Sequence, residues 1–135
     1  MKESERLSRR WFEEGWIEGR VEVFHELAGE QVEARLVTGT INDLDQFLGF
    51  RSELLGAFPD LEVTVEEVLA EDDRAAVLWR MRGTHTGPGF GLAPTGRKID
   101  VQGTTWQTVR EGRIVEGLDC CDFGSMIASL SAPAH

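Results

Sequence analysis

Residues 61–86 read LEVTVEEVLAEDDRAAVLWRMRGTHT, and in them the hydrophobic pattern changes from helical to extended. Apolar and polar residues alternate on both sides of the acidic triplet Glu71-Asp72-Asp73, which is a turn signal. Alternation with a period of two is typical of β-strands that bury one face. The stretch therefore predicts two antiparallel strands, of which the second is long and covers residues 74–86.

The chain after this pair continues in the same pattern. Residues 98–110 alternate, Glu111-Gly112 is a tight-turn signal, and residues 113–122 alternate again. The stretch GPGFGLAPTG, residues 87–96, predicts a loop because glycine and proline interrupt regular structure. A segment around residues 30–37 is a further strand candidate.

The chain before residue 60 has a helical period instead. We expect a first helix that breaks near Gly19, a second that stops at Gly29, and a third that Asn42 caps and Pro59 ends. Their apolar faces carry Leu7, Trp11, Phe12 and Trp16, then Val21, Phe24, Leu27 and Ala28, then Leu44, Phe47, Leu48, Leu54, Leu55 and Phe58. Helices followed by antiparallel strands predict one α+β domain over 1–135, a cone of N-terminal helices packed on a strongly bent, mixed or antiparallel sheet. The apolar interior of such a cone is a natural small-molecule site.

Composition narrows the classes of function. The 24 acidic and 14 basic residues give a net charge of −10, which repels nucleic acid. No apolar run is long enough to span a membrane, and the first residues are too charged for a signal peptide, so a cytoplasmic location is expected. The two cysteines, Cys120 and Cys121, are adjacent and lack the spacing of metal ligands, so no metal site is expected.

The last predicted strand carries a candidate acid/base. Val115, Gly117, Asp119 and Cys121 share one face of it. If that face is the inner one, Asp119 is a carboxylate in an apolar cavity. Burial raises the pKa of such a group and makes it a useful proton acceptor and donor near neutral pH.

Two other residues have alternative interpretations. Arg51 lies in the apolar stripe of the third helix, where it either reaches solvent along that surface or points a cation into the cavity. His85 precedes the glycine-rich loop, where it is either a general base or a hydrogen-bonded structural group.

Four motifs in this order carry a resemblance to a known family: F-P-D-L (58–61), G-T-H-T-G (83–87), P-T-G-R (94–97) and G-R-I-V-E (112–116). From about residue 5 to residue 130, the chain resembles the SnoaL-like polyketide cyclases of the nuclear-transport-factor-like, ketosteroid-isomerase-like superfamily. The resemblance implies a cone-shaped α+β barrel, a homodimer through the outer sheet face, and chemistry without a cofactor. It also implies that Asp119 is the general acid/base of an intramolecular aldol ring closure.

The sequence departs from the family at three places. Relatives often read E-H-W-D where this chain has Glu116-Gly117-Leu118-Asp119, and often carry His or Asp where Thr105 stands. They often show His or Asn on the first strand, where this chain has Glu33-Ala34-Arg35. We expect an aromatic, sparsely polar pocket lined by Phe12, Trp16, Arg35, Phe50, Arg51, Trp79, Met81, His85, Thr105, Gln107 and Gly117.

Three functions stay open at this stage. The first is an acid/base enzyme on a polyketide-like or other carbonyl-rich hydrophobic molecule, with a hydrogen bond from Thr105 or Gln107. The second is a small-molecule binding module without catalysis. The third is an aromatic hydroxylase or an epoxide hydrolase, and epoxide opening would require Arg35 or Arg51 beside Asp119. Separately, an outer sheet face with Leu78, Trp106, Ile114 and Leu118 would be apolar enough to form the dimer.

Overall fold

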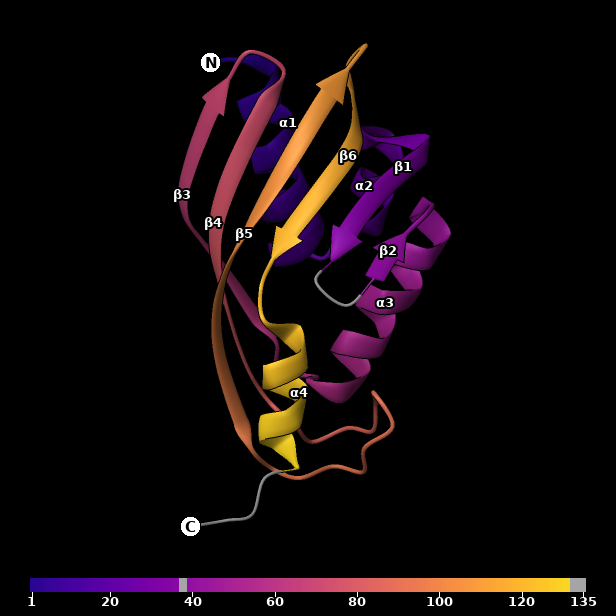
Figure 1. The fold of residues 1–135 in the computed structure, drawn as a ribbon, viewed down its shortest axis with the longest axis vertical. Helices are drawn as coiled ribbons and strands as arrows, with labels where there is room; N and C mark the ends of the chain where they lie inside the picture. Colours follow the sequence, from indigo (N-terminus) through magenta and orange to yellow (C-terminus); the bar gives the residue numbers. More distant parts are fainter. Residues whose placement is uncertain (37–38, 132–135) are drawn as a thin grey trace.

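The computed structural model describes residues 1–36 and 39–131, without the side chains of residues 30, 31, 35, 36 and 39. The described strands form one six-stranded sheet in the order β2-β1-β6-β5-β4-β3. Helices α1, α2 and α3 lie against one face of this bent sheet, and α4 continues from the end of β6 (Figure 1). The expected α+β cone is therefore confirmed, with the sheet left unclosed.

The first helical segment joins two helix types. Helix α1 (Glu3–Arg10) runs directly into the π-helix η1 (Trp11–Ile17), in which the Glu18 N–H donates to the Glu13 carbonyl five residues back, at 3.0 Å. Trp11 and Trp16 are also five residues apart, so the wider turn of η1 brings both rings to the same side. The uneven apolar spacing in the sequence thus reflects a change of helix type.

The next helices correct two expected boundaries. Helix α2 (Val21–Leu27) ends before Ala28, which pairs with Ile114 and opens β1 (Ala28–Leu36), so Gly29 lies in a strand and not at a helix stop. Helix α3 (Leu44–Ala57) begins after Asp43, whose carboxylate accepts the Gln46 N–H, and not after Asn42. Both side chains are good N-caps, and the backbone decides which one is used.

The strands after α3 match the predicted pattern closely. They are β3 (Glu62–Glu71), β4 (Arg74–Thr84), β5 (Lys98–Arg110) and β6 (Arg113–Cys120), and the prediction for 98–110 is confirmed to the residue. A register shift between Val65 and Glu67 keeps Val63, Val65 and Val68 opposite the buried face of β4, which explains their uneven spacing. Strand β1 confirms the candidate at 30–37 as far as residue 36, and residues 37–38 lie outside the described residues.

Several details of the fold were not predicted from the residues. The short strand β2 (Gly39–Ile41) pairs antiparallel with β1, and β1 pairs parallel with β6. Helix α4 (Phe123–Leu130) begins where Asp122 accepts the Ser125 N–H, so β6 ends earlier than expected. A register shift between Thr108 and Val109 turns Ile114 inward, where it is buried, so its expected place on the outer sheet face is wrong.

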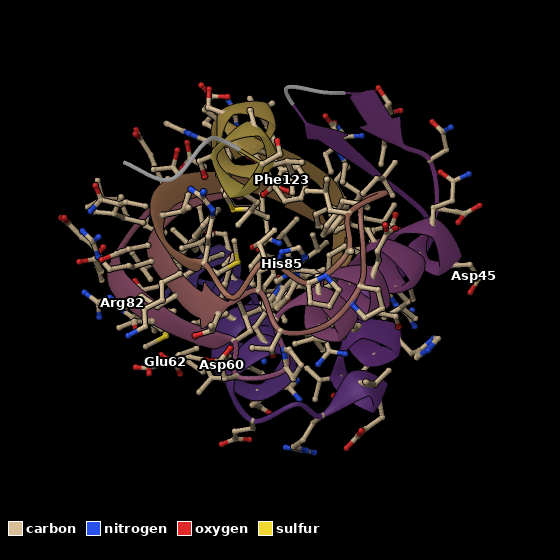
Figure 2. The ribbon with its side chains drawn as sticks, turned by 90° about the horizontal axis from the view of Figure 1, so that it is seen from below. Asp45, Asp60, Glu62, Arg82, His85 and Phe123 are labelled. Atoms are coloured by element: carbon tan, nitrogen blue, oxygen red, sulfur yellow. The ribbon has the colours of Figure 1, made fainter. Side chains whose placement is uncertain are left out.

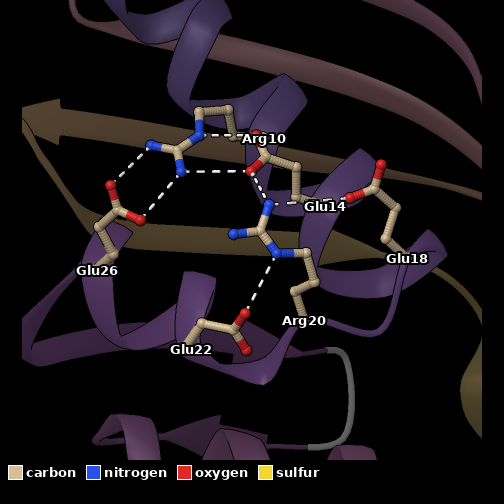
Figure 3. A network of polar contacts seen from close by, with 6 residues as sticks. All are labelled: Arg10, Glu14, Glu18, Arg20, Glu22 and Glu26. Carbon is tan, nitrogen blue, oxygen red and sulfur yellow. Dashed lines mark hydrogen bonds and ion pairs between the residues drawn. The ribbon is translucent and has the colours of Figure 1, made fainter.

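Charged side chains connect the outer surfaces of α1, η1 and α2 (Figure 3). The Arg10 guanidinium contacts Glu14 at 2.7 Å and Glu26 at 3.0 Å, and Arg20 contacts Glu14 at 3.0 Å. The hydrogen bond from Arg10 holds the pKa of Glu14 below its ordinary value. Such exposed pairs stabilise little individually, but together they fix the helices that cover the cavity. No helix in the described part of the chain has the length and apolar character needed to cross a membrane.

Candidate active site

A cavity lies between the inner face of the sheet and the helices η1 and α3. Its volume is about 110 Å³. Its walls are largely aromatic and aliphatic, and the lining residues are Trp11, Phe12, Trp16, Val32, Ala34, Ile41, Asp43, Phe47, Phe50, Leu54, Val63, Trp79, Met81, Thr105, Gln107, Gly117, Asp119, Cys121 and Phe123.

Asp119 lies on β6 directly opposite Thr105 of β5. The Thr105 hydroxyl donates a hydrogen bond to Asp119 Oδ1 at 2.5 Å, and the Trp79 indole N–H donates to Thr105 Oγ1 at 2.8 Å. Trp79 and Thr105 are both buried. Since the indole occupies a lone pair of the hydroxyl oxygen, the single hydroxyl proton is directed at the carboxylate. Trp79 and Thr105 therefore hold one carboxylate oxygen of Asp119 in place.

Burial dominates the electrostatics of this carboxylate. Desolvation raises the pKa of Asp119 above its ordinary value, and the hydrogen bond from Thr105 opposes that rise. The neighbouring thiol is affected too, because burial and the charges of Asp119 and Asp122 raise the pKa of Cys121. Among the described side chains, no guanidinium forms an ion pair with Asp119. The carboxylate thus accepts one hydrogen bond, from the Thr105 hydroxyl, in a cavity whose walls are largely apolar.

Thr105→Val is expected to raise the pKa of Asp119 further. The hydroxyl donates to the ionised carboxylate, so its removal favours the protonated form. Thr105→Ser, which keeps a donor, is expected to titrate as the wild type does. Carbon-13 NMR of the aspartate carboxyl groups measures this, with Asp119→Asn identifying the signal. An unchanged or lower Asp119 pKa in Thr105→Val would contradict the hydrogen-bond arrangement.

Most of the residues expected at the pocket come together in it. These are Phe12, Trp16, Phe50, Trp79, Met81, Thr105, Gln107 and Gly117, and they surround Asp119. Strand periodicity accounts for Thr105, Gln107, Gly117 and Asp119, because these residues alternate inward on β5 and β6. Arg35 pairs with Leu118 through its backbone, and its side chain lies outside the described residues.

His85 does not line the cavity, contrary to expectation. It follows the end of β4, and its fully buried ring packs on Phe58 with 5.5 Å between the centroids. Its Nδ1 lies 2.9 Å from Thr95 Oγ1, and its backbone N–H donates to the Arg97 carbonyl. Figure 2 views the molecule from the end at which His85 and Phe123 lie. His85 therefore anchors the 87–96 loop, and of its two interpretations the geometry fits the structural one.

Arg51 also lies outside the cavity lining. One residue along a helix turns the side chain by about 100°, and the cavity face of α3 carries Phe47, Phe50 and Leu54. Arg51 instead stacks on Trp16 and Phe24, with its guanidinium carbon 5.6 and 5.4 Å from the ring centroids. Burial lowers its pKa. The side chain is held by cation–π contacts and not at the carboxylate.

Several site residues were not predicted from the sequence. Asp43, Phe47 and Leu54 line the cavity with Phe50, at spacings of three and four that mark one face of α3. Phe123 enters from α4, the helix that was missed. Gly103 supports the site without lining the cavity. A Cβ at this position would lie only 2.6 Å from the Trp79 ring. A glycine inside a strand can mark such a close approach, and here it makes room for the indole that holds Thr105.

In the described part of the chain, no three histidine, cysteine, aspartate or glutamate side chains gather in a group that could hold a metal ion. Besides the indole N–H groups of its tryptophans, the polar side chains in the cavity lining are those of Asp43, Thr105, Gln107, Asp119 and Cys121. Asp43 is already engaged as the cap of α3. This leaves Asp119 as the carboxylate placed for chemistry.

Comparison with known proteins agrees with the fold. The family model for SnoaL-like polyketide cyclases matches residues 6–130. A candidate SnoaL-like polyketide cyclase from Jannaschia sp. CCS1 is 29% identical, with a TM-score of 0.88 over 98% of this chain and 94% of that one. The candidate polyketide cyclase IdmH from Streptomyces antibioticus is 28% identical, with a TM-score of 0.78 over 98% and 100%.

A third solved structure shares the fold alone. It is AclR, a candidate hydroxylase from Streptomyces galilaeus, which is 21% identical with a TM-score of 0.76 over 90% of this chain and 78% of that one. No curated protein sequence matches the chain.

Proposed function

The chain belongs to the SnoaL-like polyketide cyclase family, and on that basis we propose that it is an acid/base enzyme whose proton acceptor and donor is Asp119. The observation that carries the proposal is a desolvated carboxylate at the wall of an apolar cavity, held by Thr105 through one oxygen. The aldol cyclisation or isomerisation of a carbonyl-rich hydrophobic molecule fits this arrangement. No cofactor takes part in the proposed chemistry, and this independence, like the cytoplasmic location, stays a prediction.

The proposed step begins at the carboxylate oxygen that Thr105 does not hold. This oxygen accepts a proton from a carbon next to a carbonyl, and the electron pair of the C–H bond becomes an enolate. In a ring closure, the enolate carbon then attacks a second carbonyl of the same molecule. Asp119 returns the proton to the alkoxide oxygen that forms, so the carboxylate is regenerated. A cavity with apolar walls limits access of water and protects the enolate from premature protonation.

The walls favour a compact aromatic substrate. Trp16, Trp79, Phe12 and Phe50 present flat apolar surfaces. At about 110 Å³, the cavity is smaller than most ligand pockets, which measure roughly 300–1,000 Å³. We therefore propose a compact polyketide-like molecule with an aromatic ring and neighbouring carbonyl groups.

Proton exchange tests the proposal without the natural substrate. The protein is incubated in heavy water with a panel of 1,3-dicarbonyl and anthrone-like compounds, and NMR follows the loss of the activated C–H signal. Faster loss with the wild type than with buffer is expected, and Asp119→Asn should abolish the acceleration. If panel members stabilise the protein in a thermal-shift assay but none exchanges, the second function applies and the protein is a non-catalytic binder.

Epoxide opening receives no support from the described side chains. It would require an arginine beside Asp119, but Arg51 stacks on aromatic rings elsewhere. The likeness to AclR is a likeness of fold and does not bear on hydroxylation.

We also propose that the protein forms a homodimer through the outer face of β3, β4 and β5. Trp106 and Leu69 are 44% and 66% exposed there, beside a shallow groove that Ala76 and Leu78 help to line. A second copy of the chain would cover these apolar groups. Sedimentation velocity is expected to show a dimer at micromolar concentration and a monomer for Trp106→Glu. A monomeric wild type would contradict this interface.

A further inference from the structure

We propose that the Gln107 amide is the group that binds the substrate's carbonyl oxygen while Asp119 removes the neighbouring proton. This inference rests on the proposed function and adds to it a residue that selects the substrate. Gln107 lies on β5 two residues after Thr105, so its side chain points to the same inner face. It would stabilise the negative charge that develops on the oxygen as the enolate forms.

The first observation is that the oxygen of this amide has no partner. Gln107 lines the cavity and is only 3% exposed, yet its Oε1 has no hydrogen-bond partner among the described residues. Buried amides are almost always satisfied in native proteins, and an exception calls for an explanation. A ligand in the cavity supplies one, because the amide group turns about its Cγ–Cδ bond and presents either its N–H₂ donors or its oxygen to the ligand.

The second observation is the residue opposite. Gln107 pairs with Gly117 of β6, which has no side chain. A Cβ built on Gly117 would find no atom closer than 3.9 Å, so the space beside Gln107 is open. The open space at 117 and the amide at 107 therefore belong to one subsite.

The third observation is that Thr105 is not free for this role. Its hydroxyl proton goes to Asp119, and its oxygen accepts the Trp79 indole N–H. Thr105 is therefore excluded as the donor to the substrate, and Gln107 stays as the donor on this strand. Of the two donors that the sequence left open, the structure assigns Gln107.

The two groups are placed for one small substrate. Asp119 faces Thr105, and Gln107 faces Gly117 on the same strand pair, so Gln107 and Asp119 are diagonal neighbours. Such neighbours have Cα atoms about 7–8 Å apart. A ketone with an acidic C–H beside its carbonyl can therefore reach both side chains. The subsite selects ketones, and above all 1,3-dicarbonyl compounds, over hydrocarbons of the same shape.

Binding of a matched ligand pair tests the inference separately from catalysis. The probes are 2-acetylnaphthalene and 2-ethylnaphthalene, and only the first has a carbonyl oxygen. This oxygen accepts hydrogen bonds but does not donate them. An ionised Asp119 has no proton to donate, so it cannot favour the ketone. The wild type is expected to prefer the ketone by about three- to tenfold, as one net hydrogen bond gives. Gln107→Leu should lose this preference, whereas Gln102→Leu, on the outer face of the same strand, should keep it.

Kinetics supply the second readout. In the heavy-water exchange assay, Gln107→Leu is expected to lower kcat by about 10²–10³, as removal of one oxyanion donor does, with a smaller change in KM. A wild type without ketone preference, or a Gln107→Leu variant that keeps it, would overturn the inference. If the ketone preference depends on Gln107 but no exchange depends on Asp119, the subsite stands and the proposed catalysis fails.

Discussion

Asp119→Asn is expected to lower the rate of catalysed proton exchange by about 10²–10⁴, which is the usual contribution of one positioned acid/base. Asparagine has nearly the same shape and can still accept the hydrogen bond from Thr105 through its amide oxygen. It cannot take up a proton from carbon, so the walls and the Thr105 contact survive while the chemistry does not. The rate is measured by NMR in heavy water with the panel described above.

A second carboxylate at the cavity provides the matched control. Asp43 also lines the cavity, but its carboxylate accepts the Gln46 N–H at 2.8 Å and caps α3. Asparagine is as good a cap as aspartate, so Asp43→Asn keeps the helix end. The rate loss in Asp43→Asn is expected to be far smaller than in Asp119→Asn. Equal losses in both variants would contradict the assignment of the base.

The unfolding temperature of Asp119→Asn provides an independent test of the raised Asp119 pKa. Because burial raises the pKa of Asp119, this group stabilises the fold most at low pH, and its contribution is lost as pH rises through the folded-state pKa. At neutral pH the ionised carboxylate costs folding free energy that a neutral amide does not. Asp119→Asn should therefore unfold at a higher temperature than the wild type at pH 7, and the gap should narrow on acidification.

Gly87→Ala is expected to be the most destabilising single methyl addition in the 87–96 loop. A Cβ at residue 87 would lie 1.9 Å from the Gly56 carbonyl oxygen and 3.0 Å from the carbon of that group. The Gly87 N–H also donates to the Ala57 carbonyl at 3.2 Å, so the loop backbone is held against the end of α3. Backbone atoms cannot give way as a side chain can. We expect a loss of more than about 3 kcal/mol of unfolding free energy, above the usual range for overpacking.

A glycine-to-alanine substitution in α3 should instead raise the free energy of unfolding. Gly49 is exposed within α3, and a Cβ there would meet no atom within 4 Å. Gly49→Ala is therefore expected to stabilise the protein by about 0.5–1 kcal/mol. Chemical denaturation of the two variants beside the wild type gives both values. A Gly87→Ala protein as stable as the wild type would show that the loop does not pack on α3 in this way.

The long strands were predictable because one buried face imposes a period of two on the sequence. Strand β5 matched its predicted limits, and its pairing with β6 around Glu111-Gly112 followed from the turn residues. The irregularities were not predictable, because a bulge adds a residue without a sequence signature. The bulge next to Val109 turned Ile114 from the expected outer face into the core. Helix α4 was missed because its sequence is short and rich in small residues.

The residues of the candidate site were also predictable in the strands and harder to place outside them. Residues on β5 and β6 were placed on the correct face, since alternation fixes the direction of a side chain in a strand. Arg51 and His85 were misplaced for different reasons. In a helix, the step from Phe50 to Arg51 rotates the side chain off the cavity face, and His85 lies just beyond β4, where alternation no longer applies. The contact between Gly103 and Trp79 is tertiary and has no local signal.

The central claim is that the cavity presents one desolvated carboxylate as the proton acceptor. The pH dependence of the exchange rate, measured for the wild type beside Asp119→Asn, tests it most directly. The wild-type rate should fall on acidification through a single ionisation with a midpoint above the ordinary aspartate pKa, because burial raises the pKa of Asp119. The Asn variant should be slow and lack this ionisation. A variant that keeps the same rate and the same ionisation would show that another group removes the proton.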